Sequence, residues 1–129
     1  AMLSYSTRGS AKSESVQKVI DATAIVRTKA PHILIDGDLQ FDSAFVPEVA
    51  KLKAKDSPLE GKANVYIFPE LNSSNIAVKV AERMVPGTRI CGPVSQGLAK
   101  PINDVSRACD APYIMTMASI TALQCGGSL

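Results

Sequence analysis

Short apolar runs alternate with longer amphipathic stretches along nearly the whole chain, and this alternation restricts the possible fold more than any other feature. The runs end at Pro, Gly or small polar residues, which stop regular structure. The repeated order of strand and helix predicts a three-layer α/β domain over residues 1–129, with helices on both faces of a mostly parallel sheet. Strands are predicted at residues 2–6, 32–39, 63–68 and 89–94, and helices at 12–29, 46–54, 72–84 and 110–124.

The first and last helices have the clearest periodicity. Ser10 or Ser13 is expected to cap the first helix, and Pro31 follows its end. Asn72 is the expected cap of the third helix. Apolar positions repeat at helical spacing in the first and last helices, which predicts one buried face on each: Val16, Val19, Ile20, Thr23 and Val26 in the first, and Ile114, Met117, Ala118, Thr121 and Cys125 in the last.

Charge and cysteine content exclude several classes of function. The 14 Lys and Arg residues nearly balance the 12 Asp and Glu residues, so the net charge of +2 does not indicate a nucleic-acid binder. The cysteines Cys91, Cys109 and Cys125 form no CxxC pair, and His32 is the single histidine, so we expect neither a disulfide framework nor a metal site. A reducing, cytoplasmic location is therefore expected.

Some charged residues have a simple structural interpretation. Loop ends and helix caps explain Asp36, Asp38 and Asp42 more simply than a cation site does. A solvated surface is expected for the scattered lysines Lys51, Lys53, Lys55 and Lys62.

The loops after the predicted strands are the candidate binding regions, because ligands of parallel sheets bind beyond the carboxyl ends of the strands. Small hydroxyl residues surround Gly9 in residues 6–10, which fits either a phosphate at a helix N-terminus or ordinary capping. Residues 72–75 have the same two interpretations. The long polar stretch 97–107 ends in Ser106 and Arg107, a pair that can hold an oxyanion or a phosphoryl group.

Four segments together resemble the phosphate acetyltransferase (phosphotransacetylase) family. They are MLSYSTRGSAK (2–12), IDGDLQFD (35–42), FPELN (68–72) with Asn75-Ile76, and GPVSQGLAKPINDVSR (92–107). The similarity runs in register from residue 2 to about Gln124 and corresponds to the C-terminal portion of that longer enzyme. It implies reversible acetyl transfer between coenzyme A and phosphate without a metal or organic cofactor, in a homodimer. It also implies an isocitrate-dehydrogenase-like fold with the active site in a cleft between two α/β domains.

The resemblance also assigns candidate site residues. Ser106 and Arg107 match the family's Ser-Arg pair, which contacts the thioester or acetyl phosphate. Ser6 and Thr7 match a loop lining the substrate cleft. Asn75 lies in a loop near the coenzyme A site, and the segment with Lys100 and Asn103 shapes the cleft.

The sequence departs from the family after the Ser-Arg pair. Ala108 replaces a Gly, and Tyr113 stands where the family has the Asp assigned as general base. Asp110 lies three residues earlier, about one helical turn away. Either Asp110 takes over as the catalytic base, or a local shift realigns the helix, or the base is lost.

Two other functions remain open on these residues. One is a non-catalytic acyl-CoA-sensing or oligomerising domain, like the one appended to some bacterial malic enzymes. The other is a phosphate butyryltransferase, which changes only the acyl group. Because the resemblance covers part of the enzyme, the 129-residue chain alone is expected to be inactive.

Overall fold

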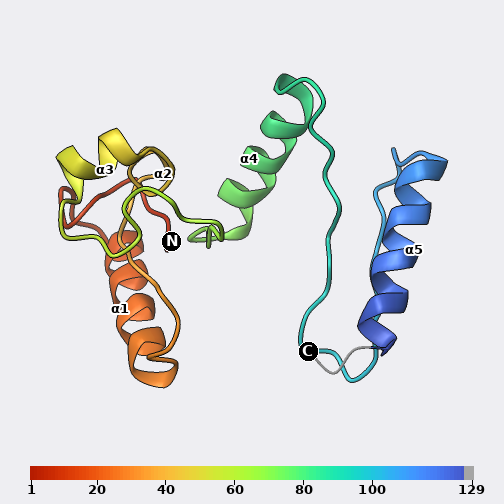
Figure 1. Ribbon diagram of the computed structural model, residues 1–129, viewed down its shortest axis with the longest axis horizontal. Coiled ribbons are helices and arrows are strands. Elements are labelled where there is room, and N and C mark those ends of the chain that lie inside the picture. The colour runs from red at the N-terminus through yellow and green to blue at the C-terminus, as the bar shows by residue number, and fades with distance from the viewer. Residues whose placement is uncertain (127–129) are drawn as a thin grey trace. The chain divides into compact units, whose positions relative to one another are not determined.

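The computed structural model describes residues 1–126, which contain five helices (Figure 1). The chain divides into two compact units, Ala1–Ala77 (unit 1) and Val78–Leu129 (unit 2). The helices are α1 (Glu14–Lys29), α2 (Phe41–Phe45), α3 (Pro47–Lys53), α4 (Leu71–Met84) and α5 (Ala111–Gly126). The four predicted helices are thereby confirmed to within a few residues, and α2 is an additional short helix.

Local sequence signals explain where the helices of unit 1 begin. The Ser13 hydroxyl accepts a hydrogen bond from the Val16 amide at 3.3 Å, so Ser13 rather than Ser10 caps α1. Pro47 is the first residue of α3, where its missing N–H costs no hydrogen bond. Val16, Val19 and Thr23 of the predicted α1 stripe are buried.

Parallel pairing in unit 1 occurs as isolated bridges. Residues 1–4 lie between two other segments, with parallel bridges from Leu3 to Leu39 and from Met2 to Ile67. Main-chain hydrogen bonds join the segments, including Leu3 N to Ile67 O at 2.8 Å and Ser4 N to Leu39 O at 2.8 Å. Helices with these two parallel bridges fit the α/β class, but no parallel sheet forms within residues 1–126.

The predicted continuous strands do not form in residues 1–126. Three of the four predicted segments contribute bridges, but Ile33 and Leu34 are 49% and 67% exposed instead of buried in a strand. Residues 89–94 form no strand because their backbone pairs with no other extended segment in the described part of the chain. A strand needs a neighbouring main chain for its hydrogen bonds, and periodicity alone does not supply one.

Unit 1 has a small apolar core. Alanines at several of its positions allow the bridging segments and the short helices α2 and α3 to pack closely. The core residues are Ala1, Leu3, Leu39, Ala44, Ala54 and Leu59, with Ala63, Tyr66 and Phe68 packed against them.

Asp36 is a buried charge of unit 1 that is paired at both of its oxygens. Its side chain is fully buried, and its two carboxylate oxygens accept hydrogen bonds from different arginines. Arg8 Nη2 lies 2.8 Å from Oδ2 and Arg27 Nη2 lies 2.6 Å from Oδ1. The two ion pairs connect three parts of unit 1. Arg8 lies in the loop at residues 6–11, Arg27 lies in the last turn of α1, and Asp36 lies in the segment that pairs with residues 2–4.

Gly37, the next residue, lies against two other parts of the same unit. A Cβ atom at this position would be 2.5 Å from Met2 Cβ and 2.9 Å from Thr23 Oγ1. Only glycine therefore fits at position 37 without displacing the segment of Met2 or α1.

In unit 2, extended chain runs beside α5 (Figure 1). The prediction of a buried stripe on this helix was wrong except at Met117, which is 2% exposed. Ile114 is 49% exposed, and Leu123, on another face, is 75% exposed. Burial requires an element facing the stripe, and the described residues of unit 2 place only extended segments along α5. No helix within residues 1–126 is both long and apolar enough to cross a membrane.

We predict that Asp36→Asn lowers the free energy of unfolding by about 2 kcal/mol, because the substitution removes the charge that both arginines bind. Both guanidinium groups are partly exposed and regain some hydration, so the loss is smaller than for a fully buried pair. Urea unfolding measures the change. Asp56→Asn in the exposed loop is the control and should change stability by less than about 0.5 kcal/mol. Equal stability of the two variants would contradict the structural role of Asp36.

Candidate functional site

The loop at residues 6–11 is closed by its own hydrogen bonds. Ser6 is fully buried, and its Oγ accepts a bond from the Ala11 amide at 3.1 Å. The Thr7 amide donates to Ser10 Oγ at 3.0 Å, and the Arg8 amide donates to the Asp38 carbonyl at 3.1 Å. Ser10 N donates to the Thr7 carbonyl, and the Gly9 amide binds the Asp38 carboxylate at 3.1 Å. The structure favours neither interpretation of this loop. Ser13 caps α1 instead, and each of these amides already has a partner within the protein.

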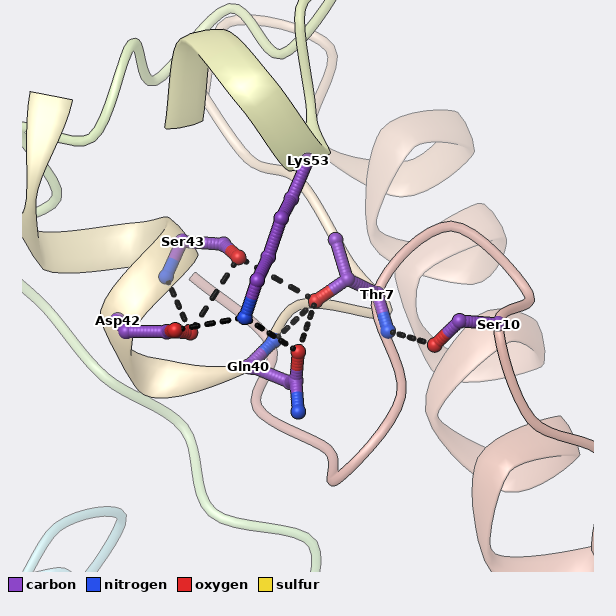
Figure 2. A network of polar contacts seen from close by, with 6 residues as sticks. All are labelled: Thr7, Ser10, Gln40, Asp42, Ser43 and Lys53. Carbon is purple, nitrogen blue, oxygen red and sulfur yellow. Dashed lines mark hydrogen bonds and ion pairs between the residues drawn. The ribbon is translucent and has the colours of Figure 1, made fainter. Parts of the chain in front are cut away.

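Thr7 belongs to a polar network shown in Figure 2. Its hydroxyl accepts a hydrogen bond from the main-chain amide of Gln40 at 2.9 Å. The same hydroxyl lies 3.3 Å from Oε1 of the Gln40 side chain. Ser43 Oγ lies 3.4 Å from the same hydroxyl. Lys53 on α3 completes the network by donating to Gln40 Oε1 at 3.2 Å and to Asp42 Oδ2 at 2.7 Å.

The position of Lys53 corrects the expectation of a merely solvated lysine. Its ammonium group reaches Asp42 on α2 and Gln40 just before that helix. The hydrogen bond from Lys53 is the main cause that holds the pKa of Asp42 below its ordinary value of 3.8, and hydrogen bonds from Ser43 add to the effect. Sequence reasoning missed this contact because nothing in the spacing of residues 42 and 53 indicates that they meet.

Asn75 lies on the exposed side of the first turns of α4. The predicted cap at Asn72 was wrong, because the Glu70 carboxylate accepts the bonds from the Asn72 and Ser73 amides at 2.6 and 2.7 Å. The pKa of Glu70 is lowered from its ordinary value, and the hydrogen bonds from Ser73 are the largest cause. Residues 72–75 therefore form a capped helix start, with the Asn75 side chain accessible.

Asn103 in unit 2 is held by three hydrogen bonds of its amide group. Its Oδ1 accepts from the Ser95 amide at 2.8 Å. Its Nδ2 donates to Thr121 Oγ1 at 2.8 Å and to Gln124 Oε1 at 2.6 Å. Both donors of the side chain are therefore used to fasten the loop to α5. Lys100, earlier in the same loop, is exposed.

Ser106, Arg107 and Asp110 lie together immediately before α5. Ser106 Oγ accepts a bond from the Ala108 amide at 3.3 Å, and its carbonyl accepts one from the Cys109 amide at 3.0 Å, which closes a tight turn. Arg107 within this turn is exposed and forms no ion pair or hydrogen bond with any residue in 1–126. The turn thus exposes the Arg107 guanidinium, which has no partner in the described part of the chain, and Ser106 precedes it in sequence.

Asp110 caps α5. Its Oδ1 accepts a hydrogen bond from the Tyr113 amide at 2.8 Å, and its carbonyl accepts the bond from the Ile114 amide. The carboxylate remains exposed. Asp110 therefore caps the helix while its carboxylate stays accessible.

Tyr113 has a role that the sequence did not reveal. Its hydroxyl donates to the carbonyl of Gly92 and accepts a bond from the amide of the same residue at 3.2 Å. The Tyr113 side chain is thereby bound to the main chain of Gly92. The predicted site residues are divided between the two units. Ser6, Thr7 and Asn75 belong to unit 1, and Lys100, Asn103, Ser106, Arg107 and Asp110 belong to unit 2.

We predict that Lys53→Met raises the pKa of Asp42 toward its ordinary value, because the main cause of the lowering is removed. Since the folded-state pKa lies below 3.8, the pair stabilises the protein above that pH, and this stabilisation is lost as pH falls through the folded-state pKa. An NMR titration of the Asp42 carboxyl carbon measures both values. Lys51→Met on the same helix is the control, and an unchanged pKa in Lys53→Met would show that the pair does not form.

Comparison with known proteins gives consistent similarities over nearly the whole chain. It is 57% identical over 124 residues to the phosphate acetyltransferase of Acetivibrio thermocellus and 51% identical to that of Bacillus subtilis. Each alignment covers 96% of this chain but only 37% and 38% of the relative. The chain thus spans little more than a third of the length of these relatives.

Two solved structures are also similar to nearly the whole chain. A phosphotransacetylase from Streptococcus pyogenes matches 96% of this chain with a TM-score of 0.89 and 49% identity. The EutD phosphotransacetylase from Staphylococcus aureus matches the same share with a TM-score of 0.87 and 46% identity. The family described as phosphate acetyl/butaryl transferase matches residues 1–122. This chain therefore belongs to the phosphate acetyl/butaryl transferase family.

Proposed function

We propose that the protein carrying this chain catalyses reversible acetyl transfer between acetyl-CoA and inorganic phosphate, giving acetyl phosphate and coenzyme A. The observation that carries the proposal is the family membership over residues 1–122, together with relatives that are named phosphate acetyltransferase. Because the chain spans 37% of the first of these relatives, we assign the activity to a longer protein and expect the chain alone to be inactive.

The group before α5 suits the requirements of acyl transfer. In the direction of acetyl-CoA synthesis, the coenzyme A thiol loses its proton and the thiolate attacks the acetyl carbonyl of acetyl phosphate. A carbon–sulfur bond forms, the carbon–oxygen bond to phosphate breaks, and phosphate leaves. The reaction needs a base for the thiol proton, a cation for the phosphoryl oxygens and a donor for the oxyanion of the tetrahedral intermediate.

Three residues of unit 2 are assigned to these roles. The exposed guanidinium of Arg107 binds the phosphoryl oxygens with parallel N–H donors. The hydroxyl of Ser106, in the same turn, donates to the oxyanion. The exposed carboxylate of Asp110 accepts the thiol proton in place of the family's Asp, which Tyr113 replaces.

The remaining candidates take supporting roles. Lys100 is an exposed cation for a phosphate group of the substrate, and Asn103 holds the loop in shape through its bonds to α5. In unit 1, Thr7 and Ser6 shape a cleft wall through their buried hydrogen bonds, and Asn75 offers an accessible amide group to coenzyme A.

The family also suggests the fold and the assembly of the full-length protein. We assign the mostly parallel sheet and the isocitrate-dehydrogenase-like three-layer fold to the full-length protein, and a homodimer as its assembly. Acyl transfer of this kind needs no metal or organic cofactor, because the thiolate itself is the nucleophile. The free cysteines Cys91, Cys109 and Cys125 support a reducing, cytoplasmic location.

Tyr113 supports a second candidate function. A chain without the family's Asp at this position suits a non-catalytic acyl-CoA-sensing or oligomerising domain, like the one appended to some bacterial malic enzymes. A third candidate, a phosphate butyryltransferase, is compatible with the family description. Turnover of acetyl-CoA and butyryl-CoA by the full-length protein separates the three functions.

We predict that Arg107→Ala in the full-length protein lowers kcat/KM for phosphate-dependent turnover of acetyl-CoA by about 10²- to 10³-fold, because a donor to the charged substrate is removed. Release of the coenzyme A thiol gives the rate. Arg83→Ala on the exposed surface of α4 is the matched control and should retain the wild-type rate. Wild-type turnover by Arg107→Ala would contradict the site assignment.

We predict that Asp110→Asn lowers kcat by about 10²-fold or more while leaving stability nearly unchanged. The substitution removes the proton acceptor, but Asn caps a helix as well as Asp does. Steady-state kinetics and thermal unfolding of the same variant separate the two effects. If kcat is unchanged, Asp110 is only a helix cap and another group accepts the proton.

A further inference from the structure

All five candidate site residues of unit 2 lie in one loop, which runs from Gly92 to Tyr113. The residues are Lys100, Asn103, Ser106, Arg107 and Asp110. The loop has no regular secondary structure before α5 begins at Ala111. A loop of this length has many conformations, so the positions of Ser106 and Arg107 depend on the contacts that hold the loop in place.

One side chain joins the two ends of this loop. The Tyr113 hydroxyl donates its proton to the Gly92 carbonyl and accepts the Gly92 amide proton at 3.2 Å. Tyr113 lies in the first turn of α5, so these bonds attach the start of the loop to the rigid helix at its end. The hydroxyl proton is already committed to a main-chain acceptor.

Asn103 provides a second attachment farther along α5. Its amide group links Ser95 with Thr121 and Gln124, and Gln124 Nε2 also donates to the Ser95 carbonyl at 3.2 Å. The loop is therefore fastened near both ends of the helix. The stretch between the two attachments, residues 104–110, contains Ser106, Arg107 and Asp110.

Tyr113 is also connected directly to one of the proposed catalytic groups. Its amide donates to Asp110 Oδ1 at 2.8 Å, while its hydroxyl holds Gly92. A single residue thus links the beginning of the loop, the helix N-terminus and the carboxylate of Asp110. No other residue in 1–126 has hydrogen bonds to both Gly92 and Asp110.

We propose that Tyr113 is a positioning residue for acetyl transfer, whose hydroxyl closes the loop 92–113 and thereby sets the positions of Ser106, Arg107 and Asp110. This inference rests on the proposed function. It assigns a purpose to the residue that replaces the family's Asp: Tyr113 acts through Gly92 and exchanges no proton with the substrate.

The test uses Tyr113→Phe in the full-length protein, because this variant removes only the hydroxyl oxygen. Hydrogen exchange of a peptide containing Gly92 reports the attachment directly, and kcat, KM and their pH profiles report its effect on turnover. We expect at least tenfold faster exchange at Gly92 and about a tenfold lower kcat/KM. The pH profile should not shift, because no titrating group of the reaction is removed.

Tyr66→Phe is the matched control. The Tyr66 hydroxyl donates to the Ala63 carbonyl in unit 1, so this variant loses the same kind of bond at a place remote in sequence from the loop. Exchange at Gly92 and turnover should both stay within twofold of wild type.

Three results would overturn the positioning role. Unchanged exchange at Gly92 in Tyr113→Phe would show that the attachment is absent. Wild-type turnover despite faster exchange would show that the attachment does not position the site. Loss of one limb of the pH profile would make Tyr113 a proton-transfer group. A wild-type protein without acetyl-CoA turnover would instead contradict the proposed function, which separates that failure from the others.

Discussion

The buried carboxylate of Asp36 is the interaction on which the arrangement of unit 1 depends. A fully buried charge is costly unless it is paired, and two arginines from different segments bind its two oxygens. Arg27 lies in the last turn of α1, and Arg8 lies in the loop at residues 6–11. The same residue lies beside Gly37, where close packing leaves no room for a side chain. Charge pairing and steric fit therefore fix the same part of the unit.

The helices could be predicted from sequence because their determinants are local. The Ser13 cap, the apolar spacing of Val16 and Val19, and Pro47 at the start of α3 all act within a few residues. Strands depend on partners that are distant in sequence. The apolar run at 32–39 contributes a bridge only at Leu39, and residues 89–94 find no partner in residues 1–126. Periodicity indicates which residues suit a strand but does not supply the neighbouring main chain.

The site shows the same division between local and distant signals. The proximity of Ser106, Arg107 and Asp110 follows from their closeness in sequence, and the turn and helix cap that organise them are short-range features. The contact between Tyr113 and Gly92 spans the whole loop, and the contact between Lys53 and Asp42 joins two helices. Neither contact has a spacing signal. The resemblance to a family identified Tyr113 as a departure, and only its hydrogen bonds indicate what the residue does.

The internal hydrogen bonds of the loop at residues 6–11 have a consequence for binding. Ser6 and Ser10 accept amides of the loop itself, and Asp38 accepts two more. A segment held in this way has already lost its conformational entropy on folding, so a ligand that contacts it does not have to order it. Its main-chain donors are also occupied, which leaves discrimination between ligands to the shape of the loop and to exposed side chains. The loop is preorganised rather than adaptable.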